Sequence, residues 1–420
     1  MVTLLRDHVP GLAHGHATAR DHATLVRDAL QGHTVTQQTT TRDAEHHGVG
    51  IDLRFGSNAV RLSAAMWLVA GALVAAFTLF TPTLWEKAEP FSPGPDYRIP
   101  YALSSDYWHY RRYAREAAAA DKTLVIGDSV VWGQYVAADQ TLSHYLSRAA
   151  GGQKFANLGL DGAHPVALAG LMEYYGGDIA GRRVLLHCNL LWTASKKHDL
   201  QEKKEFRFNH PSLVPQFAPD IPCYTENLSR RLSIVIERRS AFSAWANHLR
   251  VAYLDQMDLA AWTMQHPYDN PVAALWPRSL STDSPPQHDA APWTERGIQR
   301  QSFAWVDLEG SLQWQSFRRT VEILRERGNQ VFVLIGPFNE HMLEDANRPV
   351  YADRQRAVEA WLRERGIPCL APEPLPSHLY ADASHPLSEG YALLARRLME
   401  DTAFAKWLGP PTVTNQDQRP

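Results

Sequence analysis

The chain has 420 residues, of which 45% are hydrophobic and 21% charged, and its formal net charge is −3. This is enough apolar sequence for one large domain with additions, or for two domains. A chain without a basic excess is not typical of a nucleic-acid-binding protein, so we expect no nucleic acid among its partners. Three cysteines are too few to staple a chain of this length, which excludes a disulfide scaffold.

Residues 1–57 contain seven of the nineteen histidines and few large apolar residues. We interpret them as a disordered cytoplasmic tail. A metal-binding tail is an alternative, although no histidine spacing repeats. A third interpretation is that translation starts at Met66, which would make residues 1–65 an artefact of the assigned start.

An uncharged stretch runs from Leu62 to Trp85 and is long enough to cross a hydrocarbon layer of roughly 30 Å as a helix. We therefore predict a transmembrane anchor over residues 58–85. Arg54 and Arg61 precede the stretch, so the positive-inside rule predicts a single-pass protein of the cytoplasmic membrane whose main domain is exported to the periplasmic side. A buried helix of a soluble core is the alternative, although such helices seldom lack charge on every face for so long.

The segment that follows the anchor, residues 86–120, contains Pro90, Pro93, Pro95 and Pro100. Proline-rich segments are stiff and extended. We therefore predict a semi-rigid linker that lifts the main domain off the bilayer.

Export would place the three cysteines in an oxidising compartment, where disulfides form and persist. Cys223 and Cys369 are then candidates for a pair, which would leave Cys188 free. The sequence alone does not determine this connectivity.

From residue 121 to about residue 410, short apolar runs alternate with amphipathic stretches, and a disordered tail is expected over residues 411–420. The runs that we predict to be buried strands are Thr123–Gly127, the segment around Phe155, Val184–Asn189 and Val331–Gly336. Helices are predicted around Leu142–Leu146, Leu168–Tyr175, Phe317–Arg327, Arg354–Arg365 and Glu389–Met399. This alternation predicts an α/β domain with a parallel sheet covered on both faces.

The region from 193 to 311 breaks the alternation and holds scattered tryptophans, prolines and charged residues. Helices are predicted within it over Leu228–Arg239 and Ala241–Met257. We interpret the region as a large insertion at the carboxyl edge of the sheet, where it can wall a substrate cleft.

A serine follows the first predicted strand directly, in the run Gly127-Asp128-Ser129. A serine at a sharp turn from strand to helix is lifted to the carboxyl end of the sheet, and the N–H groups of the helix start lie nearby to stabilise an oxyanion. The tripeptide is common, so by itself it is weak evidence for a nucleophile.

Two further groups at strand ends can stabilise an oxyanion. Gly162 closes the run from Asn157 to Gly162, and a glycine there lets a backbone N–H approach a reacting carbonyl closely. Asn189 ends the strand run Val184–Asn189, and its side-chain amide is a donor. Taken singly, either residue also fits an ordinary turn.

An aspartate and a histidine three residues apart, Asp382 and His385, precede the last predicted helix. This spacing lets a carboxylate bind one ring nitrogen of the imidazole and leaves the other as a base for a hydroxyl. Pro386 restricts His385 to extended conformations, which indicates a defined loop.

Together these motifs resemble the four sequence blocks of the SGNH (GDSL-type) serine hydrolase superfamily, which centre on Ser, Gly, Asn and an Asp-x-x-His pair in that order. The runs GDSVVWG, NLGLDG, VLLHCN and DASHPLSEGY match the four blocks. The resemblance covers about residues 122–190 and 330–398 and leaves the insertion unexplained. It implies a three-layer α/β/α sandwich with a flavodoxin-like parallel sheet.

The resemblance also implies roles for individual residues. Ser129 would be the nucleophile, His385 the general base and Asp382 the group that orients the imidazole. The backbone N–H groups of Ser129 and Gly162 and the amide of Asn189 would form the oxyanion hole. Asp128 is expected to make structural hydrogen bonds near the turn, and no metal or organic cofactor is expected.

The third block departs from the family, which usually has Gly-x-Asn-Asp where this chain has His187-Cys188-Asn189-Leu190. His187 crowds the strand end, which puts simple, broad esterase activity in doubt. We expect His187 to be a core histidine bound to a backbone carbonyl, with a polar contact to substrate as the alternative.

A closer resemblance is to the membrane-anchored branch of the superfamily, which includes the teichoic-acid D-alanylation proteins and polysaccharide O-acetyltransferases. Pro337-Phe338-Asn339 is similar to a motif of the D-alanylation group. The branch implies acylated carbohydrate or cell-envelope polysaccharide as substrate and a multi-spanning membrane acyltransferase as a possible partner. Three functions stay open: an ester hydrolase, a polysaccharide O-acyltransferase and a non-catalytic envelope-binding module.

Overall fold

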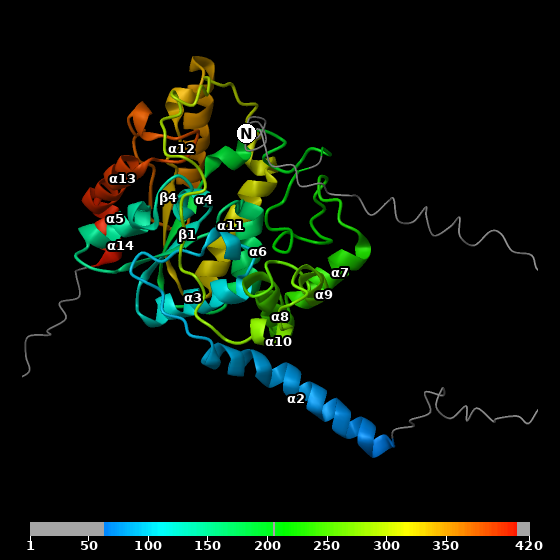
Figure 1. Cartoon of the computed structure of the whole chain (residues 1–420). Coiled ribbons are helices and arrows are strands. Elements are labelled where there is room, and N and C mark those ends of the chain that lie inside the picture. Colours follow the sequence, from blue (N-terminus) through cyan, green and yellow to red (C-terminus); the bar gives the residue numbers. More distant parts are fainter. Residues whose placement is uncertain (1–62, 205, 410–420) are drawn as a thin grey trace, which may run out of the picture. The chain divides into compact units, whose positions relative to one another are not determined.

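The structure is a computed structural model that describes residues 63–204 and 206–409 (Figure 1). The predictions for the tail 1–57, for the start of the anchor at 58–62 and for the tail 411–420 lie outside these residues. So does the assigned start of the chain.

The sheet is parallel and has five strands in the order β2-β1-β3-β4-β5. Their bounds are β1 Thr123–Gly127, β2 Phe155–Gly159, β3 Arg183–Cys188, β4 Gln330–Ile335 and β5 Cys369–Leu370. Ile126 of β1 pairs with Leu158 on one side and with Leu186 on the other. Every residue of β1 and β2 is buried, as expected of strands covered on both faces. The predicted parallel α/β fold is confirmed.

Helices cover both faces of this sheet (Figure 1). On one side α5 (Leu142–Ala149), α13 (Ser388–Glu400) and α14 (Thr402–Leu408) pack together. On the other side lie α3 (Tyr107–Ala119), α6 (Pro165–Tyr175), α11 (Leu312–Glu326) and α12 (Arg348–Glu364). Each predicted helix of the α/β pattern is present, whereas α3 and α14 were not predicted.

The predicted anchor forms α2, a helix over Ala64–Ala88. It is long and apolar enough to cross a membrane, and none of its most apolar stretch is buried inside the protein. Its exposed side chains include Leu68, Leu73 and Leu79, which are 75%, 66% and 70% exposed. The alternative of a buried core helix is therefore wrong.

The segment after α2 does not form the predicted spacer. Tyr97, Ile99 and Leu103 are buried in the main domain, and Asp106 caps α3 by accepting a hydrogen bond from the backbone N–H of His109 at 3.0 Å. The prolines restrict the backbone here, but they leave the aromatic and aliphatic side chains between them free to enter the core. Residues 97–120 are thus part of the domain.

A buried cluster of charged groups joins the end of α2 to the domain. Glu89 pairs with Arg112 of α3 at 2.6 Å and accepts a hydrogen bond from His248 Nε2 at 2.9 Å. His248 Nδ1 donates to Asp106 at 2.6 Å. Burial alone lowers the pKa of His248, but the two carboxylates around it raise that pKa to about 9. The imidazolium therefore pairs with both carboxylates at neutral pH.

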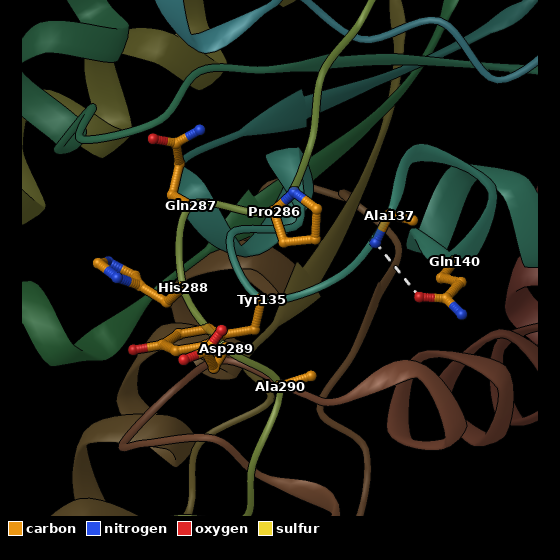
Figure 2. A pocket seen from close by; sticks show the side chains of 8 residues that line it. All are labelled: Tyr135, Ala137, Gln140, Pro286, Gln287, His288, Asp289 and Ala290. Carbon is orange, nitrogen blue, oxygen red and sulfur yellow. Dashed lines mark hydrogen bonds between the residues drawn. The ribbon is translucent and has the colours of Figure 1, made fainter.

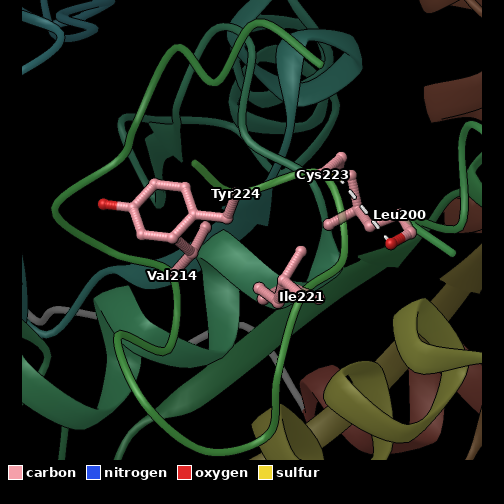
Figure 3. Close-up of a cluster of buried hydrophobic side chains, with 6 residues drawn as sticks. Leu200, Val214, Ile221, Cys223 and Tyr224 are labelled. Carbon is pink, nitrogen blue, oxygen red and sulfur yellow. Dashed lines mark hydrogen bonds between the residues drawn. The ribbon is translucent and has the colours of Figure 1, made fainter. Parts of the chain in front are cut away.

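The insertion contains α7 (Leu228–Glu237), α8 (Ala241–Ala252), α9 (Leu259–Gln265) and α10 (Pro271–Ala274). Both predicted helices of this region are present, and α8 ends earlier than expected because the chain turns with positive φ at Asp255 and Gln256. One apolar cluster of the insertion packs against Val166 of α6. Its other buried members are Leu200, Val214, Ile221, Cys223 and Tyr224 (Figure 3).

The suggested pairing of Cys223 with Cys369 is wrong. All three cysteines are free thiols in the structure. Cys223 lies in the apolar cluster of the insertion, where its thiol donates to the carbonyl of Leu200 at 3.8 Å, whereas Cys369 belongs to β5. Their different surroundings in the fold keep the two thiols apart.

Candidate active site

The candidate residues meet at the carboxyl ends of β1, β2 and β3. β1 lies between β2 and β3, so the connections from β1 to β2 and from β2 to β3 run in opposite directions along the sheet. In open α/β sheets, ligands bind outside the strand ends at such a switch point. The helix α4 (Ser129–Trp132) starts there, directly after β1.

Ser129, His385 and Asp382 form a continuous chain of hydrogen bonds. The hydroxyl of Ser129 donates to Nε2 of His385 at 2.9 Å. Nδ1 of His385 donates to the carboxylate of Asp382, at 2.8 Å and 2.9 Å from its two oxygens. Ser129 is 9% exposed and His385 is 8% exposed, so both side chains are largely shielded from water.

The loop that carries Asp382 is held by hydrogen bonds within the loop and by hydrogen bonds from Asn339, which follows β4. The backbone N–H groups of Ser384 and His385 both donate to Oδ1 of Asp382 at 3.0 Å. Asn339 donates through its amide to the carbonyl of Asp382 at 3.0 Å and through its backbone N–H to the carbonyl of Ala383 at 2.8 Å. The Pro-Phe-Asn motif after β4 thus positions the histidine loop.

The electrostatics of this pair suit a base. Burial alone would raise the pKa of Asp382, but His385 and the backbone donors hold it well below its usual range. Burial alone would lower the pKa of His385, yet the Asp382 carboxylate raises it. The pair is therefore an ionised carboxylate beside an imidazole of increased basicity, which can accept the proton of Ser129.

Asp128 organises the turn that carries Ser129. Its buried carboxylate accepts hydrogen bonds from the backbone N–H of Val130 at 3.0 Å, Nδ1 of His187 at 3.1 Å, the amide of Asn189 at 2.8 Å and the indole of Trp192 at 3.1 Å. Burial alone would raise the pKa of Asp128, but His187 and the other donors hold it low. The expected backbone-carbonyl partner of His187 is wrong, because the ring binds this carboxylate instead.

The three expected oxyanion donors, in Ser129, Gly162 and Asn189, lie just after the carboxyl ends of β1, β2 and β3. One amide hydrogen of Asn189 is engaged by Asp128, so the other is left for a substrate oxygen. Gly162 has φ +72°, and a Cβ at this position would collide with the amide of Asn209. Asn209 comes from the insertion and was not predicted, since an asparagine in an irregular segment carries no signal in the sequence.

Asp161 places an additional carboxyl group next to these donors. Its side chain is only 6% exposed, and its Oδ1 has no hydrogen-bond partner. Burial raises the pKa of Asp161 to about 6, although the charge of His385 acts in the opposite direction. Its carbonyl accepts a hydrogen bond from Nε2 of His210 at 2.7 Å, which fixes the backbone. Sequence reasoning singled out the motif here but not this side chain.

Arg98 supports the serine turn from the segment that was taken for a spacer. Its guanidinium donates to the carbonyls of Trp132 at 2.7 Å, Gly133 at 2.6 Å and Val136 at 2.9 Å. It also lies over the ring of Trp132, 3.9 Å from the ring centre. A lone arginine in a proline-rich segment offered no sequence signal for this role.

An open pocket of about 480 Å³ adjoins the site (Figure 2). Its lining residues come from the loop after α4 and from the insertion: Tyr135, Ala137, Gln140, Pro286, Gln287, His288, Asp289 and Ala290. The hydroxyl of Tyr135 donates to Oδ2 of Asp382 at 3.1 Å, and its ring lies 5.4 Å from that of His385. This tyrosine is thus a wall shared by the pocket and the Ser129–His385–Asp382 site.

Within residues 63–204 and 206–409, no group of three or more His, Cys, Asp or Glu side chains is placed to hold a metal ion. Comparison with models of known protein families gave no match for this chain, and comparison with curated proteins gave none either.

Gly159 at the end of β2 tests how tightly the serine turn is packed. We expect Gly159→Ala to destabilise the protein by about 1–3 kcal/mol, because the added methyl group would collide with the backbone of Val131 and Trp132 in α4. Gly177→Ala is the control, since a Cβ there meets open space. The measurement is denaturant unfolding of both variants in detergent micelles, and equal stability of the two would contradict the packing.

Proposed function

We propose that the chain is a serine-dependent acyl-ester hydrolase of the SGNH type that acts outside the cytoplasmic membrane on acylated carbohydrate or a cell-envelope polymer. The observation that carries the proposal is the chain of hydrogen bonds from Ser129 through His385 to Asp382. The strand order, with the serine turn directly after β1, also supports the SGNH assignment. Export of the domain is proposed from α2 and the arginines that precede it.

The reaction would proceed through an acyl-enzyme. Oγ of Ser129 attacks the ester carbonyl carbon while its proton moves to Nε2 of His385, and Asp382 stabilises the resulting imidazolium. The negative charge of the tetrahedral intermediate would receive hydrogen bonds from the N–H groups of Ser129 and Gly162 and from the second amide hydrogen of Asn189. Collapse breaks the bond to the alcohol, which takes the proton from His385.

The second half of the proposed reaction hydrolyses the acyl-enzyme and restores the free enzyme. Water attacks the acyl-enzyme carbonyl while Nε2 of His385 accepts its proton. The bond to Oγ of Ser129 then breaks, and Ser129 recovers a proton from the imidazolium as the carboxylic acid leaves. No bound cofactor takes part in this proposed sequence. The alternative of a non-catalytic module is disfavoured, because binding alone would not require the hydrogen-bond chain between these three residues.

One observation favours a second candidate, transfer of the acyl group to a carbohydrate hydroxyl. The open pocket beside His385 has polar side chains from the insertion, among them Gln287, His288 and Asp289, together with the ring of Tyr135. Polar groups with an aromatic wall suit a sugar, and a hydroxyl held there would compete with water for the acyl-enzyme.

The acyl content of the envelope polysaccharide distinguishes the two reactions. In a strain that lacks the protein, we expect the ester-linked acyl content to rise, because a hydrolase removes these groups. Alkaline release of the acyl groups followed by their quantification measures it, and complementation with Ser129→Ala is the control. A fall in acyl content would instead assign transfer.

A fluorophosphonate probe tests the nucleophile directly. We expect the wild-type protein to be labelled and Ser129→Ala to lose labelling completely, since the probe reacts with a hydroxyl that has a base beside it. Ser195→Ala is the matched control: Ser195 also contacts a histidine, His198 at 3.0 Å, but no carboxylate orients that ring in the described part of the chain. Labelling that survives Ser129→Ala, or that disappears in Ser195→Ala, would refute the assignment.

The pH dependence of that labelling reports the charge of Asp161. The carboxylate of Asp161 raises the pKa of His385, and labelling requires the neutral imidazole. Asp161→Asn therefore lowers the pKa of His385 and shifts the acidic limb of the rate profile to lower pH. Asp289→Asn, an exposed carboxylate of the pocket, is the control and should leave the limb in place because solvent screens it. An acidic limb that stays at the same pH or moves to higher pH in Asp161→Asn would contradict the coupling between Asp161 and His385.

A further inference from the structure

The insertion exposes large apolar side chains to an unusual degree. Outside α2, the exposed large hydrophobic residues of the described chain all lie between 228 and 276, except Tyr101 and Phe217. They are Leu228, Leu232, Ile236, Leu259, Met264, Tyr268, Val272 and Trp276. Apolar side chains gathered on one part of a protein mark a site of contact with a partner or a membrane. We call these eight residues the apolar surface of the insertion.

On α7 these residues form a single stripe. Leu228, Leu232 and Ile236 are four residues apart and are 64%, 48% and 66% exposed, whereas Ile234 on another face is fully buried. Four-residue spacing places side chains one above another on a helix. Arg239, two residues after the end of α7, is also exposed. An exposed apolar stripe on a helix is typical of a helix that lies in a membrane interface.

Contacts with α2 define the depth at which the insertion would lie in a bilayer. The uncharged part of α2 extends from Ala64 to Trp85, and a hydrocarbon-spanning segment of about 20 residues placed anywhere within it contains Phe77. The ring of Phe77 lies 5.7 Å from that of Phe242, at the start of α8. If α2 crosses the bilayer, the start of α8 therefore reaches the acyl chains.

α9 and α10 lie beside the end of the uncharged part of α2, farther along that helix than Phe77. Trp85, at the end of the uncharged part of α2, packs in one cluster with Trp262 of α9 and with Ala274 and Leu275 at α10. Tryptophan is favoured at the boundary between acyl chains and headgroups. If α2 crosses the bilayer, the side chains of α9 and α10 that point away from this cluster, such as Met264 at 83% exposed, lie at the same boundary.

We propose that the apolar surface of the insertion is a second membrane contact, which lies in the interface of the leaflet from which α2 emerges. The occupant is lipid, because the surface continues the lipid-facing helix α2 and contains Trp276 and Tyr268, whose rings suit the headgroup level. A single helix would let the domain swivel about its anchor. Two contacts hold the Ser129 site at one height and orientation above the bilayer, independently of the reaction it performs.

Fluorescence quenching tests this contact on the full-length chain in nanodiscs of phosphatidylethanolamine and phosphatidylglycerol. The exposed positions Met264→Cys and Val272→Cys are labelled with the polarity-sensitive dye NBD, and lipids with a nitroxide near the headgroup or along the acyl chain are added. Leu73→Cys on α2 is the positive control, and Asp353→Cys on α12 is the negative control. The unsubstituted chain measures labelling of the native thiols.

We expect the labels at 264 and 272 to emit at shorter wavelength and to be quenched by nitroxide near the headgroup, whereas the label at 353 is unaffected. If the label at 73 is quenched while the labels at 264 and 272 behave like the label at 353, the proposal is overturned. The partner of this surface is then a protein. If the label at 73 is not quenched, the premise that α2 crosses the bilayer is wrong, and the proposed second membrane contact is overturned with it. Neither outcome changes the fluorophosphonate test of Ser129.

Discussion

The buried carboxylate of Asp128 is the point on which the arrangement of the site depends. It receives hydrogen bonds from α4 and from the residues at and after the end of β3, so it joins the segments that follow two adjacent strands. A buried carboxylate is stable only if its oxygens are satisfied. The donors must therefore converge on it, and their convergence fixes the direction in which the next residue, Ser129, presents its hydroxyl to His385.

The departure of the third motif from the SGNH pattern has a structural explanation. His187 packs against Gly127, where a Cβ would lie 2.7 Å from that of the histidine, and its ring binds Asp128. The glycine on β1 thus makes room for the larger residue on β3. His187 thus contributes to the serine turn from inside the core, through its hydrogen bond to Asp128.

Segments distant from the sheet contribute as much to the site as the strands do. Arg98 holds the end of α4 from the segment after α2, and Asn209 lies against Gly162 from the insertion. The buried charges of Glu89 and His248 connect the same two parts of the chain near the end of α2. α2, the insertion and the turn that carries Ser129 are therefore parts of one packed unit, which gives the proposed second membrane contact a route to orient the site.

The sequence by itself determined the strands β1 to β4, the helices between them and the apolar helix α2, because these depend on local periodicity and on the absence of charge, whereas the short strand β5 was not predicted. It also indicated Ser129, Asp382 and His385, since the turn after a strand and a three-residue spacing are local features. The linker and the cysteine pairing were wrong, and Arg98, Asn209, Tyr135 and the unpartnered carboxyl of Asp161 were missed. Their roles come from burial and from contacts between distant segments, and desolvation and contact exist only after the chain has folded.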